Sequence, residues 1–158
     1  RQPVPWLRTE FNEGFGSFSP DSLWIAYISN ESGRNEVYVR PFTSPDPAAA
    51  STPNRPGGLK QQVSKDGLGS YRLRWRADGK ELFFQDRQDS VMSVDVSTNP
   101  VFRSGIPRPL FKLPLGTGGW DVAGDGKRFL LTLAADTTES SAVPPIIVML
   151  NWAARPRQ

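Results

Sequence analysis

The residues that could carry chemistry in this chain are mainly aspartates, glutamates and arginines, because the sequence contains no histidine and no cysteine. Without these two residue types, the chain cannot by itself form a Ser-His-Asp triad, a Cys-His nucleophile or a Cys/His zinc site. Carboxylates can still act as general acid and base, and guanidinium groups can still bind anions. The candidate sites are therefore sought among these charged side chains.

Three arginines alternate with other residues in the run YRLRWR, namely Arg72, Arg74 and Arg76. Alternate side chains of a β-strand point to the same face of a sheet, so a strand here would place the three guanidinium groups together. If that strand lines a channel, Arg72 and Arg74 are predicted to bind an anionic ligand or an acidic peptide. The alternative is a solvated strand face whose arginines pair with nearby Asp and Glu residues.

Two glycine-containing stretches, residues 66–70 and 116–120, form a second kind of candidate site. Glycine runs can cradle phosphate, but neither stretch has the P-loop pattern or leads into a predicted helix. We expect them to be loops at one mouth of a channel, where Trp120 and Phe11 would serve as aromatic anchors for a ligand. The polar run at residues 30–35 contains a glycosylation sequon and oxygen atoms suited to a cation, but its composition also suits a hairpin turn.

Three aspartates recur at equivalent places in a repeated pattern: Asp21, Asp78 and Asp125 lie 57 and 47 residues apart. Each follows an apolar residue by three positions and is itself followed by Ser or Gly, and an apolar run comes next. Paired carboxylates can perform acid–base catalysis, but one aspartate per repeat leaves them too far apart to cooperate. An Asp in a turn also bonds to nearby backbone N–H groups. The pattern therefore predicts a tight turn between two strands, repeated three times.

The elements that position these residues are predicted to be strands alone. The 158 residues are 37% hydrophobic and 22% charged, which suits one soluble domain, and 15 Pro and 14 Gly indicate frequent turns. No stretch combines a helical period with caps. The net charge of +3 is too mild to indicate nucleic-acid binding. No apolar run approaches the roughly 20 residues of a membrane span, so we expect no membrane contact by this chain.

The predicted strands fall into units of four, which is typical of a β-propeller. The predicted parts are a leading outer strand at 3–7, blade one at 15–63, blade two at 71–111 and blade three, with only three strands, at 119–151. The leading segment resembles residues 107–111, and each begins 18 residues ahead of the aspartate of its own repeat. Proline in both segments suits an edge strand, where a missing N–H costs no ladder bond.

The run FSPDSLWIAYISNESGRNEVYVRPF, residues 18–42, resembles the repeat of TolB-type (WD-repeat-like) β-propellers. RWRADGKELFF and GDGKRFLL resemble degenerate copies, and the first repeat departs from the pattern with Ser22 where Gly is usual. Such repeats occur in periplasmic biopolymer-transport proteins, in the propellers of prolyl-oligopeptidase-like enzymes and after the kinase domain of some bacterial serine/threonine kinases. The run NESGRNEVYVRPF is most similar to the last group, which implies a sensor segment of a larger extracytoplasmic protein.

The expected fold is thus an all-β propeller fragment of about three antiparallel blades, half of a six-bladed ring. Three blades are too few to close the usual ring of about four to eight. Closure would require either the rest of a longer protein or a homodimer in which each chain lends its leading strand to the partner's third blade.

The expected function is a non-catalytic binding or protein–protein interaction module without a cofactor or metal. The alternative is the propeller portion of a hydrolase. That would be a gating domain of the prolyl-oligopeptidase type, or a glycan-active enzyme with two carboxylates about 5–10 Å apart.

Overall fold

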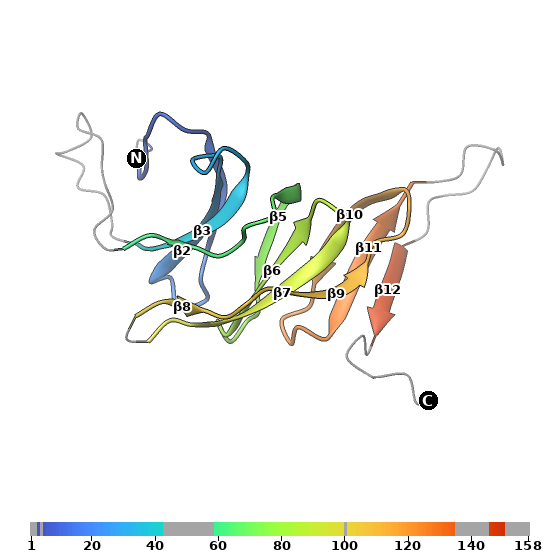
Figure 1. Ribbon diagram of the computed structural model, residues 1–158. Coiled ribbons are helices and arrows are strands. Elements are labelled where there is room, and N and C mark those ends of the chain that lie inside the picture. Colours follow the sequence, from blue (N-terminus) through green and yellow to red (C-terminus); the bar gives the residue numbers. More distant parts are fainter. Residues whose placement is uncertain (1–2, 4, 43–58, 100, 135–145, 151–158) are drawn as a thin grey trace.

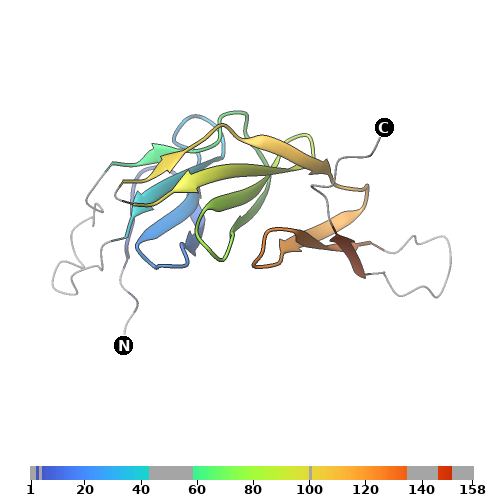
Figure 2. The ribbon, with the colours of Figure 1, turned by 90° about the horizontal axis from the view of Figure 1, so that it is seen from below.

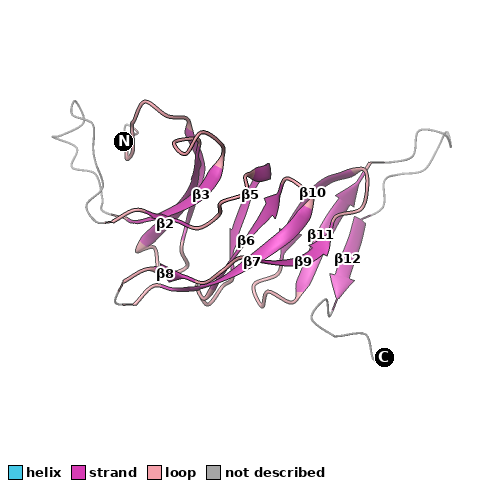
Figure 3. Cartoon of the chain, viewed as in Figure 1, coloured by secondary structure: helices cyan, strands magenta, loops and turns pink. Residues whose placement is uncertain are grey.

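The chain folds into strands joined by turns, with no helix in the part that is described (Figure 3). The computed structural model describes residues 3, 5–42, 59–99, 101–134 and 146–150. Since no helix occurs there, none in that part is long and apolar enough to cross a membrane. The expected all-β class is confirmed.

Three antiparallel sheets follow one another in chain order, and the second lies between the other two (Figures 1 and 2). The first sheet has the order β1 (Glu13–Phe18), β2 (Trp24–Ser29), β3 (Glu36–Pro41), β4 (Gln61–Gln62). The second contains β5 (Leu68–Trp75), β6 (Glu81–Asp86) and β7 (Ser90–Ser97), with β8 (Arg103–Ser104) and β9 (Arg108–Lys112) both paired to β7. The third contains β10 (Thr117–Val122), β11 (Arg128–Leu133) and β12 (Ile146–Leu150).

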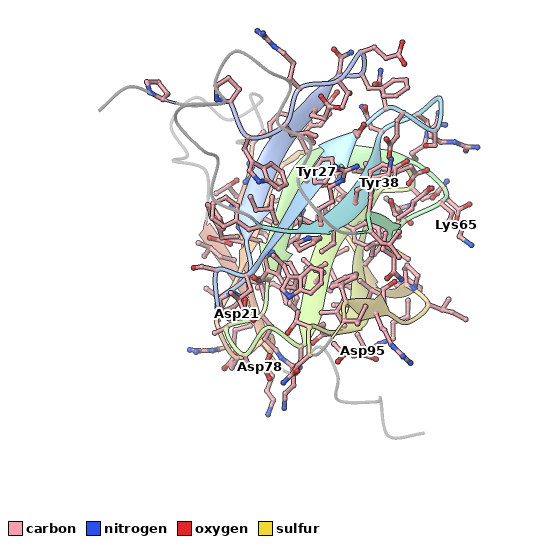
Figure 4. All side chains as sticks on the ribbon, turned by 90° about the vertical axis from the view of Figure 1, so that its left-hand side faces the viewer. Asp21, Tyr27, Tyr38, Lys65, Asp78 and Asp95 are labelled. Atoms are coloured by element: carbon pink, nitrogen blue, oxygen red, sulfur yellow. The ribbon has the colours of Figure 1, made fainter. Side chains whose placement is uncertain are left out.

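The three predicted turns are present and share one hydrogen-bond pattern. In each turn, the residue after the aspartate donates its backbone N–H to the carbonyl three residues earlier, over 2.8–2.9 Å. The three donors are Ser22, Gly79 and Gly126. The next N–H donates to Oδ1 of Asp21, Asp78 or Asp125, over 2.9–3.0 Å. Asp21 and Asp78 lie at the same end of the molecule (Figure 4). The structural role predicted for the repeated aspartates is therefore confirmed.

The second sheet is buried on both faces, which explains the continuous apolar run of β6. Leu82 and Phe84 pack toward the first sheet, whereas Phe83 packs toward Phe129 of the third sheet, 5.6 Å away between ring centroids. In the third sheet, one face of β11, with Phe129 and Leu131, takes part in this packing. On the other face, Leu130 is 41% exposed and Val148 of the neighbouring strand β12 is 55% exposed.

The prediction of a leading strand at residues 3–7 is wrong. Residues 3 and 5–7 have no strand geometry. Trp6 and Leu7 instead pack on the outer face of the first sheet, where the Trp6 ring meets Tyr27 edge-on with 6.3 Å between centroids. That face carries Ile25, Tyr27 and Tyr38, so burying its apolar area outweighs extending a sheet edge.

The short strand β8 is an element that the sequence pattern did not predict. Ahead of it, Phe102 is buried between the first two sheets, where its ring lies 5.6 Å from that of Trp24 and 6.5 Å from that of Trp75. This anchor draws the chain back against β7 before β9 begins. The local sequence did not show it because the partners lie far away in the chain.

We expect Ser22→Gly to stabilise the protein. Ser22 has φ of 59°, whereas the glycines at the equivalent turn positions, Gly79 and Gly126, have φ of 71°. A side chain in this left-handed region costs about 1–2 kcal/mol, which exceeds the entropic cost of glycine, about 0.5–1 kcal/mol. Chemical denaturation should show a gain of about 0.5 kcal/mol for Ser22→Gly and none for the control Ser22→Ala. Equal stability of the serine and glycine forms would contradict the strain argument.

Candidate functional site

The candidate site is the exposed side formed by the first strand of each of the three sheets, and we call it the first-strand wall. It consists of the outward side chains of β1, β5 and β10, and β5 contacts both of the others. Each of these strands has an irregular register with its neighbour, between Gly14 and Ser17, between Leu68 and Leu73, and between Thr117 and Gly119. Such bulges redirect side chains and are frequent beside functional sites.

An ion pair connects the second and third sheets across the first-strand wall. Arg74 Nε donates to Asp121 Oδ1 over 2.8 Å, and both side chains are partly exposed. Burial raises the pKa of Asp121, but the hydrogen bonds from Arg74 and the Val122 N–H, with the nearby guanidinium charges, lower the pKa below its ordinary value. Arg74 and Asp121 both lie four residues ahead of the aspartate of their repeat, where the first sheet has Ser17.

Arg72 lies beside this pair without a carboxylate partner among the described residues. Its guanidinium donates to the carbonyls of Trp120 and Gly118 over 3.4 and 3.5 Å, which are long hydrogen bonds. The group fits there because residue 119 is glycine: an added Cβ would lie 2.2 Å from Arg72 Nη2. Arg72 is therefore positioned by the third sheet while its charge stays uncompensated by direct pairing.

Arg76 does not join the other two arginines, contrary to the prediction that all three share a strand face. It follows the end of β5 and pairs with Asp78 over 2.7 Å and with buried Glu81 over 2.8 Å. Hydrogen bonds from Arg76 lower the pKa of Asp78. The alternative interpretation, pairing with nearby carboxylates, thus holds for Arg74 and Arg76 but not for Arg72.

Trp120 lies in the core, so its predicted place as an aromatic anchor at a channel mouth is wrong. Its side chain is 2% exposed, packs with Phe129 and donates from Nε1 to Gln85 Oε1 over 3.2 Å. The repeat contains the signal that we missed, because position 120 corresponds to Leu73, which is also buried. Phe11, just ahead of β1, is partly exposed, and its role as a binding residue stays a prediction.

The polar and glycine-containing stretches differ in structure. The prediction that residues 66–70 and 116–120 are loops is wrong for most of their length, because Leu68–Ser70 belong to β5 and Thr117–Trp120 belong to β10. In residues 30–35, the Gly33 N–H donates to the Asn30 carbonyl over 2.9 Å and Gly33 has φ of 90°, so the predicted turn is confirmed. In residues 66–70, the Gly67 N–H donates to the buried carboxylate of Glu36 over 2.8 Å. Within the described part of the chain, no group of three or more His, Cys, Asp or Glu residues could hold a metal ion.

Sequence reasoning missed an aromatic pair on the same wall. The rings of Phe15 in β1 and Tyr71 in β5 stack with centroids 4.5 Å apart and planes inclined by 11°. Both rings are more than half exposed. Tyr71 directly precedes Arg72 in the arginine run, and Phe15 occupies the position equivalent to Arg72 in the first repeat. That correspondence was the available signal.

No protein-family model and no curated protein matches the sequence. The fold is similar to part of two solved oligogalacturonate lyases. One, in complex with manganese, has a TM-score of 0.51 and 14% identity over 73% of this chain and 27% of that chain. The other, from Vibrio parahaemolyticus, has a TM-score of 0.50 and 13% identity over 77% of this chain and 30% of that chain. TolB from Acinetobacter baumannii has a TM-score of 0.42 and 13% identity over 95% of this chain and 44% of that chain.

The similarities to the two lyases confirm that the chain folds like part of a β-propeller protein, and it spans less than a third of the length of either lyase. At this level of identity they show the fold alone. They do not bear on the resemblance to the propeller segments of bacterial kinases.

We expect Asp121 to contribute to acid sensitivity. Its folded-state pKa is lowered, so the stability it contributes is present above about pH 4 and is lost as the pH falls through the lower folded value. Thermal unfolding between pH 6 and pH 2.5 should show a smaller acid-induced drop for Asp121→Asn than for the wild type. Asp66→Asn, which removes an exposed carboxylate without a salt bridge to a described residue, is the control and should follow the wild type. Parallel curves for all three proteins would contradict the assignment.

Proposed function

We propose that the chain is a non-catalytic binding module of a larger propeller assembly, and that it binds an acidic peptide segment at the first-strand wall. The observation that carries the proposal is the Arg72 guanidinium, which among the described residues makes two long hydrogen bonds to carbonyls, beside the Arg74–Asp121 pair. Hydrogen bonds between a guanidinium and a carboxylate are shorter and stronger than such contacts. An incoming carboxylate would therefore gain energy at a group that is already positioned.

The arrangement also supports a preference for peptides over isolated anions. Asp121 lies next to the two arginines, so its negative charge repels a small anion that binds close to both Arg72 and Asp121. A ligand that places one carboxylate at Arg72 and keeps its other groups away from Asp121 avoids this cost. An extended peptide with spaced Asp or Glu side chains satisfies that condition, because alternate side chains point to opposite sides.

The enzymatic alternative is less well supported. Acid–base hydrolysis of a glycan needs two carboxylates facing a common space. On the β10 part of the first-strand wall the carboxylate, Asp121, is engaged by Arg74. The two similar solved structures are oligogalacturonate lyases, and identities of 13–14% give no reason to transfer that activity to this chain. The sequence resemblance leads us to infer a parent protein with an extracytoplasmic sensor role, of the kind in which a propeller follows a kinase domain.

We expect Arg72→Gln to weaken binding of fluorescein-labelled hexaglutamate about tenfold, as measured by anisotropy at low salt. The loss of one charge-assisted hydrogen bond, about 1.5 kcal/mol, corresponds to this factor. Arg103→Gln removes the same charge from an exposed position on β8 and should leave the affinity nearly unchanged.

A glycine pair provides a second comparison. Gly119→Ala should weaken binding because its Cβ displaces the Arg72 guanidinium, whereas Gly118→Ala meets Thr132 atoms only at 3.7 Å and should not. Equal affinities of Arg72→Gln and Arg103→Gln would overturn the proposal.

We also propose that two copies of the chain close a six-bladed ring, now without exchange of a leading strand. The outer face of the third sheet exposes Leu130 and Val148. Near the outer face of the first sheet, three buried polar atoms have no hydrogen-bond partner among the described residues: Trp6 Nε1, Glu31 Oε1 and Arg40 Nε. Buried polar groups are normally paired. A neighbouring sheet would supply both apolar cover and hydrogen-bond partners.

We expect light scattering coupled to size exclusion to give a dimer mass at micromolar concentration. Leu130→Glu should shift the mass to that of a monomer, because it places a charge on the uncovered face of the third sheet. Leu115→Glu changes a residue that is 99% exposed and should leave the mass unchanged. A monomer mass for the unmodified chain would refute ring closure by two copies and would direct attention to the parent protein.

A further inference from the structure

The stacked pair Phe15 and Tyr71 is an exposed aromatic surface with no role in the core. Phe15 is 58% exposed and Tyr71 is 51% exposed, although large aromatic side chains usually gain stability by burial. Their centroids are only 4.5 Å apart, so each ring fixes the orientation of the other. The pair joins β1 of the first sheet to β5 of the second, and it therefore forms a rigid platform at the junction of two sheets.

One of these rings is positioned by a strained backbone conformation. Phe15 has φ of 55°, a conformation that is a genuine outlier for a bulky residue. It lies within the irregular stretch of β1 between Gly14 and Ser17, where the register with β2 shifts. A strained residue persists only when its surroundings impose the conformation, and such residues cluster at ligand sites. This strain directs the Phe15 ring toward Tyr71 instead of along the regular ladder.

A pocket of about 490 Å³ lies beside the platform. Besides the two rings, its polar lining consists of Asn12, Glu13, Asn30 and Asn35. Drug-sized ligands occupy clefts of roughly this size, with a few placed polar groups and an apolar wall. The pocket thus combines a flat aromatic surface with three side-chain amides at one junction.

Two of the three amides are held in place, that of Asn35 by the platform and that of Asn30 by a backbone N–H. Asn35 Nδ2 donates to the Tyr71 hydroxyl over 3.2 Å, and Asn30 Oδ1 accepts the Asn12 backbone N–H over 2.9 Å. An Asn side chain has two N–H donors and one carbonyl acceptor, so these bonds leave further hydrogen-bonding capacity in each amide. The pocket can therefore both donate to and accept from a ligand.

The charge of the lining selects among ligands. Among the described residues that line the pocket there is no Lys or Arg, and Glu13 is the one charged residue, so an anionic ligand is disfavoured. A purely apolar ligand would leave the amides without partners, which is costly. A neutral ligand with many hydroxyl groups and a flat apolar face meets both demands, since hydroxyls pair with amides and C–H groups contact the rings.

We propose that this pocket binds a neutral saccharide, with one sugar ring lying against the Phe15–Tyr71 platform and its hydroxyls hydrogen-bonded to the asparagines. The site is separate from the arginine site, because the Arg72 guanidinium bonds to carbonyls of the third sheet on the other side of β5. The proposal therefore stands whether or not the chain binds acidic peptides.

The test is isothermal titration of the whole chain with neutral tetrasaccharides of glucose and of N-acetylglucosamine, and with adenosine as a planar aromatic control. We expect one of the saccharides to bind, and Tyr71→Ala to weaken that binding about tenfold, the effect of one lost ring contact. Tyr71→Phe keeps the ring and removes only the bond to Asn35, so its affinity should lie between the two. Phe18→Ala truncates another half-exposed aromatic of β1 outside this pocket and should bind as the wild type does.

Three results would overturn the proposal. The first is that neither saccharide binds at 10 mM, on the order of the weakest specific affinities. The second is equal binding of saccharide by Tyr71→Ala and the wild type. The third is binding of adenosine alone, in a manner that depends on Tyr71. The last would identify a site for a planar base. Thermal unfolding of each variant confirms folding, and because Tyr71 lies at the surface, a large loss of stability is not expected.

Discussion

The hydrogen bond that a backbone N–H donates to the carboxylate of the aspartate two residues earlier is the constraint on which the rest of the structure depends. It closes each turn between the first and second strands of a sheet, and it recurs with almost the same length in all three sheets. The turns also contact one another. The Ala77 N–H donates to the Gly124 carbonyl over 3.0 Å, and a Cβ on Gly79 would lie 3.7 Å from Pro20. One local interaction thus sets both the turn within each sheet and the contact between sheets.

Because the turns are equivalent, the first strands present equivalent positions side by side, and the residue types at those positions decide the chemistry. Six residues ahead of the turn aspartates, the three sheets carry Phe15, Arg72 and Gly119. The glycine makes room for the arginine at one junction. At the other junction, the phenylalanine stacks on Tyr71. A repeated scaffold therefore carries two different surfaces, which agrees with the general rule that function resides in sites placed on a fold.

The features predictable from the sequence are those fixed by local interactions. The turns, the strands on either side of them and the pairing of the 108–112 segment with β7 follow from residues that are close in the chain. Residues 3 and 5–7 share the two prolines of that segment but form no strand, because an aromatic sheet face was available to Trp6. Trp120 was misplaced because glycines around it suggested a loop, whereas its ring fills the junction of two sheets. The Phe15–Tyr71 platform depends on a bulge and on a partner 56 residues away, and neither is visible in a local pattern.

The two ends of the row of sheets differ, and this difference constrains any closed ring. The outer face of the first sheet is covered by Trp6 and Leu7 of the same chain, while that of the third sheet leaves Leu130 and Val148 exposed. A second copy that completes the ring would bring the uncovered face of one chain against the covered face of the other. In that arrangement Trp6 and Leu7 would lie between two sheets, as Phe83 and Phe129 do within the chain. Both junctions made by a two-fold axis would then be the same, so Trp6 and Leu7 would contribute to each of the two contacts that close the ring.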